Sequence, residues 1–156
     1  MRTLFISFTS CALALMLSLS SAAAGDIVKV KANGNVATTA DALEAAVTGA
    51  GATLFARVDH GAGAESVGAQ LAPSQLLVFG NPKLGTPAMQ DDALAGLFLP
   101  LRVLVYEDGA GDVWLAYEDP SAMLGALDGT SADAEYLTKM TGALKKLTGV
   151  AAGAGG

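Results

Sequence analysis

The stretch "LRVLVYEDGAGDVWLAYEDP", residues 101–120, contains two runs rich in β-branched and aromatic residues, joined by Asp-Gly-Ala-Gly-Asp. Two such runs around a glycine-containing connection are typical of a β-hairpin with a longer loop. The sequence therefore predicts an antiparallel strand pair, and this pair is the clearest element from which to build the fold.

Three more strands are expected before the hairpin, in "DIVKVKANG" (26–34), "TLFARVDH" (53–60) and "SQLLVFGNP" (74–82). Each is a short β-rich run that ends in turn residues. A helix is expected between the first two strands, because Thr38 and Asp41 form a capping box and apolar residues then recur at helical spacing. "GAGAESVGAQL" (61–71) predicts a short helix that is entered through glycines.

The last predicted element is a helix that starts near Thr130, where Asp133 completes a second capping box, and stops at Gly149. Its apolar stripe should face the sheet; the stripe comprises Leu137, Met140, Leu144 and Leu147. The final residues, 151–156, are expected to form a disordered tail. The fold class is thus α+β: a mostly antiparallel sheet with helices packed on one face, a strand–helix–strand start and a C-terminal helix.

The N-terminal segment 1–24 has the pattern of a secretory signal peptide. It carries one positive charge at Arg2, an apolar run over 4–19, and small residues at Ala22 and Ala24. A retained transmembrane anchor is the weaker alternative, because no basic stop signal follows the apolar run. We therefore expect a periplasmic or secreted protein, free of the membrane after cleavage, with a single domain over 25–150.

Composition excludes several kinds of chemistry. The one cysteine, Cys11, lies within the leader, so the mature domain has no disulfide, thiol nucleophile or cysteine-ligated metal. The net charge of −6 without a clustered basic patch argues against a nucleic-acid partner. No cofactor is expected, because Ser66 replaces the third glycine of a dinucleotide fingerprint in "GAGAES", and Thr86 stands where a phosphate loop needs lysine.

Few reactive side chains remain as candidates for a site. The chain has one histidine, His60, which follows Asp59 at a predicted strand end. Strand alternation places His60 on the same side as apolar residues, which favours a hydrogen-bonded structural histidine; contact with a ligand is the alternative. Asn81, Lys83 and Thr86 follow the third strand and offer an amide, a mobile charge and a hydroxyl. We expect a shallow site for a small anionic ligand where the strand that ends at His60 approaches the loop 81–86.

Two other functions remain open. One is a small hydrolase or isomerase with His60 as general base, although no serine occupies a nucleophile elbow. The other is a metal or redox accessory protein that uses His60 with Met89, a ligand pair that a partner would have to complete.

The motifs "DHGAGA", "LLVFGNPKLGT" and "LPLRVLVYEDGAGDVWLAYEDP" together resemble the domain-of-unknown-function 302 family. The resemblance implies a compact α+β domain, often exported in bacteria and able to self-associate as a homodimer, with no established reaction. It carries the family's motif residues over to Asp59 and His60 and to the run from Phe79 to Lys83, with Thr86. Phe98 departs from the family pattern, which often has an acid before Leu-Pro-Leu.

Overall fold

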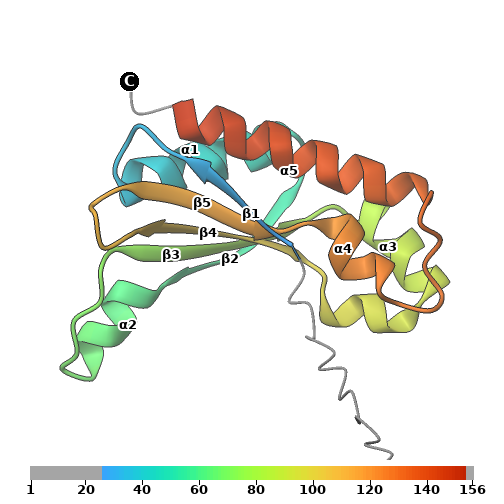
Figure 1. Cartoon of the computed structure of the whole chain (residues 1–156), viewed down its shortest axis with the longest axis horizontal. Helices are drawn as coiled ribbons and strands as arrows, with labels where there is room; N and C mark the ends of the chain where they lie inside the picture. Colours follow the sequence, from blue (N-terminus) through green and yellow to red (C-terminus); the bar gives the residue numbers. More distant parts are fainter. Residues whose placement is uncertain (1–25, 154–156) are drawn as a thin grey trace, which may run out of the picture.

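The computed structural model describes residues 26–153, so the predicted signal peptide and residues 154–156 lie outside the described part. Five antiparallel strands form one sheet in the order β1-β5-β4-β3-β2 (Figure 1). The strands are β1 (Ile27–Lys31), β2 (Thr53–Asp59), β3 (Ser74–Gly80), β4 (Leu101–Glu107) and β5 (Val113–Glu118). The predicted hairpin is β4 and β5, and the antiparallel α+β class is confirmed.

Two long helices, α1 (Val36–Gly49) and α5 (Glu135–Gly153), cover one face of the sheet (Figure 1). Because β1 and β2 are the opposite edges of the sheet, the chain crosses its whole width through α1. The shorter elements are α2 (His60–Ser66), α3 (Pro82–Asp91), the 3₁₀ helix η1 (Ala93–Leu97) and α4 (Pro120–Gly125).

The main core lies between the sheet and these two long helices. Alternate residues of β4 and β5, such as Val103 and Leu115, are fully buried against Leu43 of α1 and Leu144 of α5. A second buried cluster joins α3, η1 and α4 to the start of α5, with Leu124 and Met140 at its centre. Among residues 26–153, no helix packs over the opposite face of the sheet, which carries half-buried residues of the central strands.

The first helix begins earlier than the sequence predicts. Asn35 is the N-cap, and its Oδ1 accepts a hydrogen bond from the Thr38 backbone N–H over 2.9 Å. The capping box expected from Thr38 and Asp41 is therefore wrong, because Asp41 instead pairs with Arg57 of β2. An asparagine cap satisfies the same free N–H groups, so both assignments fit the sequence pattern.

The last helix is displaced at both ends from its prediction. It starts at Glu135 rather than near Thr130, and it runs through Gly149 to Gly153. Ala151 and Ala152 are buried against the main core, which outweighs the low helix propensity of the glycines. Residues 151–153 thus belong to the domain rather than to the predicted tail. Within residues 26–153, no helix combines the length and apolar character needed to cross a bilayer.

Candidate functional site

The strand β2 ends at Asp59, and the short helix α2 begins at His60. The Asp59 carboxylate caps this helix: Oδ1 accepts from the Ala62 N–H over 2.9 Å, and Oδ2 accepts from Gln75 Nε2 over 3.3 Å. Both carboxylate oxygens already have protein donors. Asp59 therefore has a structural role, which the helix-capping preference of aspartate explains.

His60 is exposed, in contrast to the apolar environment predicted from strand alternation. A register shift between Leu54 and Ala56 interrupts the alternation at Phe55, and the strand ends one residue before His60. A bulge of this kind moves every later side chain to the opposite face. Because its side chain is exposed, His60 has no enclosed surroundings for acid–base chemistry.

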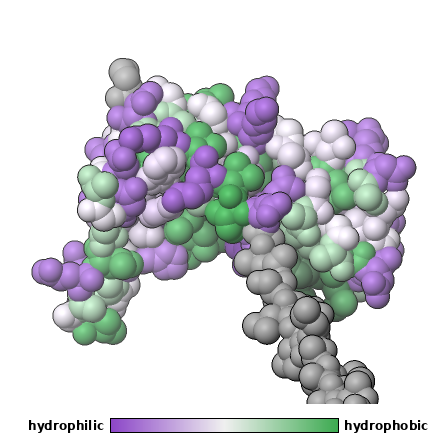
Figure 2. Space-filling view, viewed as in Figure 1, coloured by the Kyte–Doolittle hydropathy of each residue, from purple (hydrophilic) through white to green (hydrophobic). Residues whose placement is uncertain are grey.

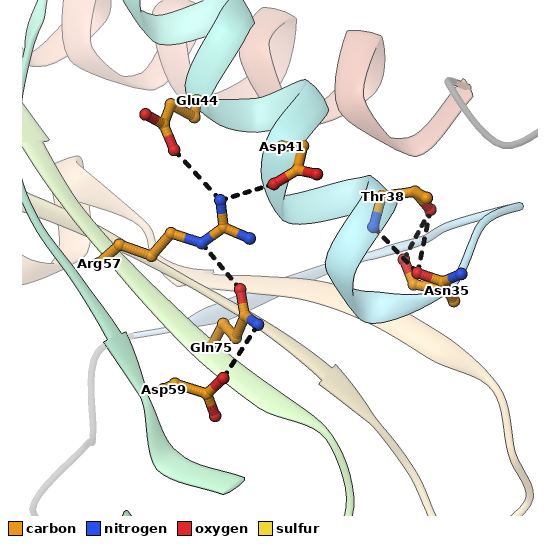
Figure 3. Close-up of polar contacts among 7 residues, drawn as sticks. All are labelled: Asn35, Thr38, Asp41, Glu44, Arg57, Asp59 and Gln75. Atoms are coloured by element: carbon orange, nitrogen blue, oxygen red, sulfur yellow. Dashed lines mark hydrogen bonds and ion pairs between the residues drawn. The ribbon is translucent and has the colours of Figure 1, made fainter. Parts of the chain in front are cut away.

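After the bulge, Arg57 points toward the helical layer (Figure 3). Its Nη1 lies 2.6 Å from Asp41 Oδ1 and 3.2 Å from Glu44 Oε2, both on α1. Its Nε donates to Gln75 Oε1 over 2.8 Å, and Gln75 in turn donates to Asp59. These side chains form a continuous polar connection from α1 to the N-cap of α2.

The predicted loop 81–86 is the start of a helix. Asn81 is the N-cap of α3, where its Oδ1 accepts from the Lys83 N–H over 2.9 Å and its Nδ2 donates to the Gly51 carbonyl over 3.3 Å. Both polar atoms of the Asn81 side-chain amide therefore form hydrogen bonds with the backbone. The Lys83 side chain is exposed, and Pro82 at the first helical position suits this helix start.

The structure does not bring the predicted site residues together. Thr53 lies opposite Gly80, whereas Asp59 lies opposite Gln75. Asp59 and His60 are thus at one end of the β2–β3 pair and Asn81 is at the other, about 20 Å away at the usual rise of a strand. The site expected between His60 and residues 81–86 does not form within one copy of the chain.

A cavity of about 300 Å³ opens instead at the end of β3 that lies next to α3. Almost all of its surface is carbon, contributed by β2, α3, the segment before β4, and α5. Its lining includes Phe55, Leu84, Met89, Leu99, Pro100 and Met140, together with Gly80, Asn81, Gly85 and Thr86. Of the predicted residues, Asn81 and Thr86 contribute to this apolar pocket, whereas Asp59, His60 and Lys83 do not.

Two glycines in the lining, Gly80 and Gly85, keep the pocket open because they have no side chain. A Cβ on Gly80 would lie 3.4 Å from Pro100 Cβ and 3.5 Å from Phe55 Cε2. A Cβ on Gly85 would lie 3.7 Å from Leu99 Cδ1 and 4.0 Å from Met89 Cε, so a larger side chain there would enter the cavity. The motif residues of this region were visible in the sequence. Phe55, Leu99 and Met140 were missed because three distant segments contribute them.

The pocket can hold a small apolar molecule. Its size lies at the lower end of the usual range for ligand sites, roughly 300–1,000 Å³. Its polar groups are few: Asn81 is the N-cap of α3, and Thr86, an exposed residue of the lining, adds a hydroxyl. In the part of the chain described, no three His, Cys, Asp or Glu side chains are grouped as metal ligands.

A second hollow, of about 590 Å³, lies on the sheet face that the helices leave open. Ile27, Leu76, Leu104 and Ala116 line its apolar part. Beside it, Lys29 Nζ lies 5.2 Å from the ring centre of Tyr106 and 4.9 Å from that of Trp114. This open face of the sheet is thus apolar at its centre, with a cation held over two aromatic rings.

The hairpin loop that borders this face is held by Asp108. Trp114 Nε1 donates to Asp108 Oδ2 over 2.8 Å, and the backbone N–H groups of Ala110 and Asp112 donate to Oδ1. The Trp114 hydrogen bond, followed by that from Ala110, holds the pKa of Asp108 below its usual range. The charged carboxylate is therefore part of the hairpin structure.

An antiparallel α+β domain with an apolar pocket beside its third strand is the class of protein that this fold and site define. The model of the family described as "Domain of unknown function DUF302" matches residues 28–147, so the chain belongs to this family. The crystal structure of an uncharacterized conserved DUF302 protein from Bacillus stearothermophilus matches 80% of this chain and 97% of its own length, with a TM-score of 0.72 and 18% identity. At that identity the likeness concerns the fold.

Curated relatives share more of the sequence over a shorter segment. The chain is 46% identical over 95 residues to proteins named "Fluoride-specific ion channel FluC 1" in Brucella suis and in Brucella abortus. The match covers 61% of this chain but 37% and 35% of those proteins. The chain thus matches only about a third of the length of these relatives.

Proposed function

We propose that the chain is an exported, non-enzymatic binding domain that takes a small apolar molecule in the pocket between β3, α3 and α5. The observation that carries this proposal is the carbon-lined cavity of about 300 Å³. Burial of apolar surface drives binding at such a site, at about 25 cal/mol for each Å² removed from water. The export rests on the leader pattern of residues 1–24.

The polar groups at the pocket favour an uncharged ligand over the anion that the sequence predicts. Both ends of the Asn81 amide are bonded to the backbone, and the Lys83 ammonium does not line the cavity. An anion that entered the pocket would lose its hydration shell and would contact mainly carbon atoms in exchange, which is unfavourable. A ligand with an alkyl body and one hydroxyl or carbonyl, placed near Thr86, satisfies the pocket.

Titration with 1-octanol, followed by ¹H–¹⁵N NMR of the isotope-labelled protein, tests this proposal. Backbone amide signals of Gly80, Gly85 and Thr86 should shift in a saturable way. The amides of Lys29 and Tyr106, which border the hollow on the open face, should stay unchanged. Absence of saturable shifts at the pocket would refute the proposal.

The curated relatives favour a second candidate role. Because a segment 46% identical to this chain makes up 37% of a protein named as a fluoride-specific ion channel, we infer that the domain acts as an accessory to such a channel. This role is compatible with a binding domain, since an accessory domain acts by contacts rather than by chemistry.

Fluoride flux from vesicles tests the accessory role. The Brucella suis protein without its matching segment should lose or change its flux, and addition of this chain should restore it. Unchanged flux after removal of the segment would contradict the role. A ¹⁹F NMR titration of this chain with sodium fluoride tests whether the chain binds fluoride itself. Direct binding would broaden the fluoride signal, whereas an accessory role through contacts with the channel would leave the signal unchanged.

A further inference from the structure

Met89 lies where the apolar pocket meets the surface of the molecule. It is a residue of α3 that lines the cavity of about 300 Å³, and it is 42% exposed. In the part of the molecule that α3, η1 and α4 form, hydrophobic residues reach the surface among hydrophilic ones (Figure 2). The thioether of Met89 therefore belongs both to the wall of the pocket and to the exposed surface.

The two atoms at the end of the Met89 side chain each lie next to a glycine. Cε lies 4.0 Å from the position of a Cβ on Gly85, which also lines the pocket. Sδ lies 3.6 Å from the position of a Cβ on Gly96 of η1, which is an exposed residue. Because Gly96 has no side chain to cover the sulfur, a small molecule in solution can approach it from that side while the methyl group adjoins the cavity.

The other sulfur atoms of the described domain are enclosed. Residues 26–153 contain three methionines and no cysteine. Met123 is 6% and Met140 is 1% exposed, and Met140 contributes to the wall of the same pocket. Exposure decides which sulfur atom an oxidant reaches first. Met89 should therefore react first, and the two buried methionines serve as internal references.

We propose that Met89 is an oxidation site that controls the pocket: hydrogen peroxide converts its thioether to the sulfoxide, and the sulfoxide weakens the binding of an apolar ligand. The sulfur lone pair attacks one peroxide oxygen, so that an S–O bond forms and the O–O bond breaks. The sulfur loses two electrons and the peroxide gains them. The leaving hydroxide takes the proton of the transferred oxygen and departs as water. This inference rests on the proposed ligand site.

The sulfoxide changes the chemistry of the pocket wall, because it replaces an apolar group with a polar one. An apolar ligand packed against the new oxygen would remove its water without supplying a hydrogen-bond donor, which is unfavourable. The change is reversible. A methionine sulfoxide reductase restores the thioether with electrons from a dithiol, which becomes a disulfide as water is released. Export, as proposed above, would place the domain in an oxidising compartment.

Peptide mass spectrometry of the full chain during treatment with hydrogen peroxide tests the modification. Met89 should gain one oxygen at least about tenfold faster than Met123 or Met140, because the two reference residues are buried. In urea the three rates should become similar, since unfolding exposes every sulfur atom. Equal rates for the three methionines in the folded protein would overturn the proposal.

Calorimetric titration with 1-octanol tests the consequence for binding. Oxidation should raise the dissociation constant of the parent about tenfold or more, and treatment with the reductase should restore it. Met89→Gln, which places an amide oxygen near the position of the sulfoxide oxygen, should bind weakly without peroxide. Met89→Leu should have the same dissociation constant before and after peroxide, whatever its starting value. Met123→Leu, outside the pocket lining, is the matched control and should keep the response of the parent.

The results separate this inference from the proposed function. Absence of saturable 1-octanol binding to the untreated parent would refute the ligand site, and the inference with it. Binding that stays unchanged once Met89 is oxidised would overturn the inference alone. A loss of affinity in peroxide-treated Met89→Leu would also overturn it, because the effect would then arise at another residue. Thermal unfolding of each oxidised protein and variant establishes that it is folded.

Discussion

Arg57 Nε donates a hydrogen bond to Gln75 Oε1 over 2.8 Å, and this pair connects the helical layer to the start of α2. On one side Arg57 reaches Asp41 and Glu44 of α1. On the other side Gln75 reaches Asp59, the N-cap of α2. No residue of α2 is buried, so these polar contacts are the side-chain connection between α2 and the helical layer.

Replacement of Gln75 by leucine should loosen α2 without unfolding the domain. Gln75→Leu removes both hydrogen bonds of the connection, each worth about 1 kcal/mol in a typical protein. Hydrogen exchange at the Ala62 and Ala64 amides should accelerate, while the thermal midpoint changes little. Gln90→Leu, at an exposed position of α3, is the control. Equal protection of α2 in both variants would show that these hydrogen bonds do not order α2.

The contact between α5 and the sheet should dominate stability. Leu144 is 1% exposed in the main core, so Leu144→Ala should cost roughly 2–5 kcal/mol in the free energy of unfolding. Val150→Ala, on the same helix at an exposed position, should cost within about 0.5 kcal/mol. Urea denaturation measures both. Similar costs for the two substitutions would show that the face of α5 assigned to the core is wrong.

The hairpin should weaken in acid. Because the Trp114 hydrogen bond lowers the pKa of Asp108 in the folded state, its stabilising effect is present above the unfolded pKa and is lost as the pH falls through the lower folded value. The parent should therefore lose stability below about pH 4 more steeply than Asp108→Asn. Fluorescence of the single tryptophan reports this directly. Asp128→Asn, which removes an exposed carboxylate outside the hairpin loop, is the control and should lose stability in acid as steeply as the parent.

Export should remove the leader. The intact mass of protein recovered from the periplasm or medium should correspond to a chain that begins at Gly25, because Ala22 and Ala24 provide the small residues required before the cut. A chain that still begins at Met1 in the membrane fraction would contradict this prediction.

The sheet could be predicted from the sequence because its signals are local. Alternation in β4 and β5 and the glycine-containing loop, with Gly111 at a φ of 82°, specify the hairpin without reference to the rest of the chain. The helix ends could not be predicted as well. Asn35, rather than Thr38, caps α1, and burial of Ala151 extends α5 beyond Gly149; both depend on tertiary contacts.

The candidate site was predicted only in part, for a similar reason. The sequence singled out Asn81 and Thr86, which do line the pocket. The sequence prediction placed His60 beside these two residues because the register of the strands was unknown. In the structure, the antiparallel pairing of Thr53 with Gly80 puts His60 and Asn81 at opposite ends of the β2–β3 pair. The bulge at Phe55 also reversed the expected faces of β2. Pocket residues such as Leu99 and Met140 carry no local signal, since only the folded chain brings them to Gly85.

Calorimetric titration with 1-octanol of the parent, Gly85→Leu and Gly63→Leu tests the proposed pocket most directly. At Gly85 a leucine side chain would grow toward Leu99 and Met89 and fill the cavity, whereas Gly63 on α2 has open space around it. We predict saturable binding to the parent and to Gly63→Leu, and binding at least about tenfold weaker to Gly85→Leu, a loss of about 1.4 kcal/mol. Equal affinity of the two leucine variants, with Gly85→Leu folded, would contradict the account.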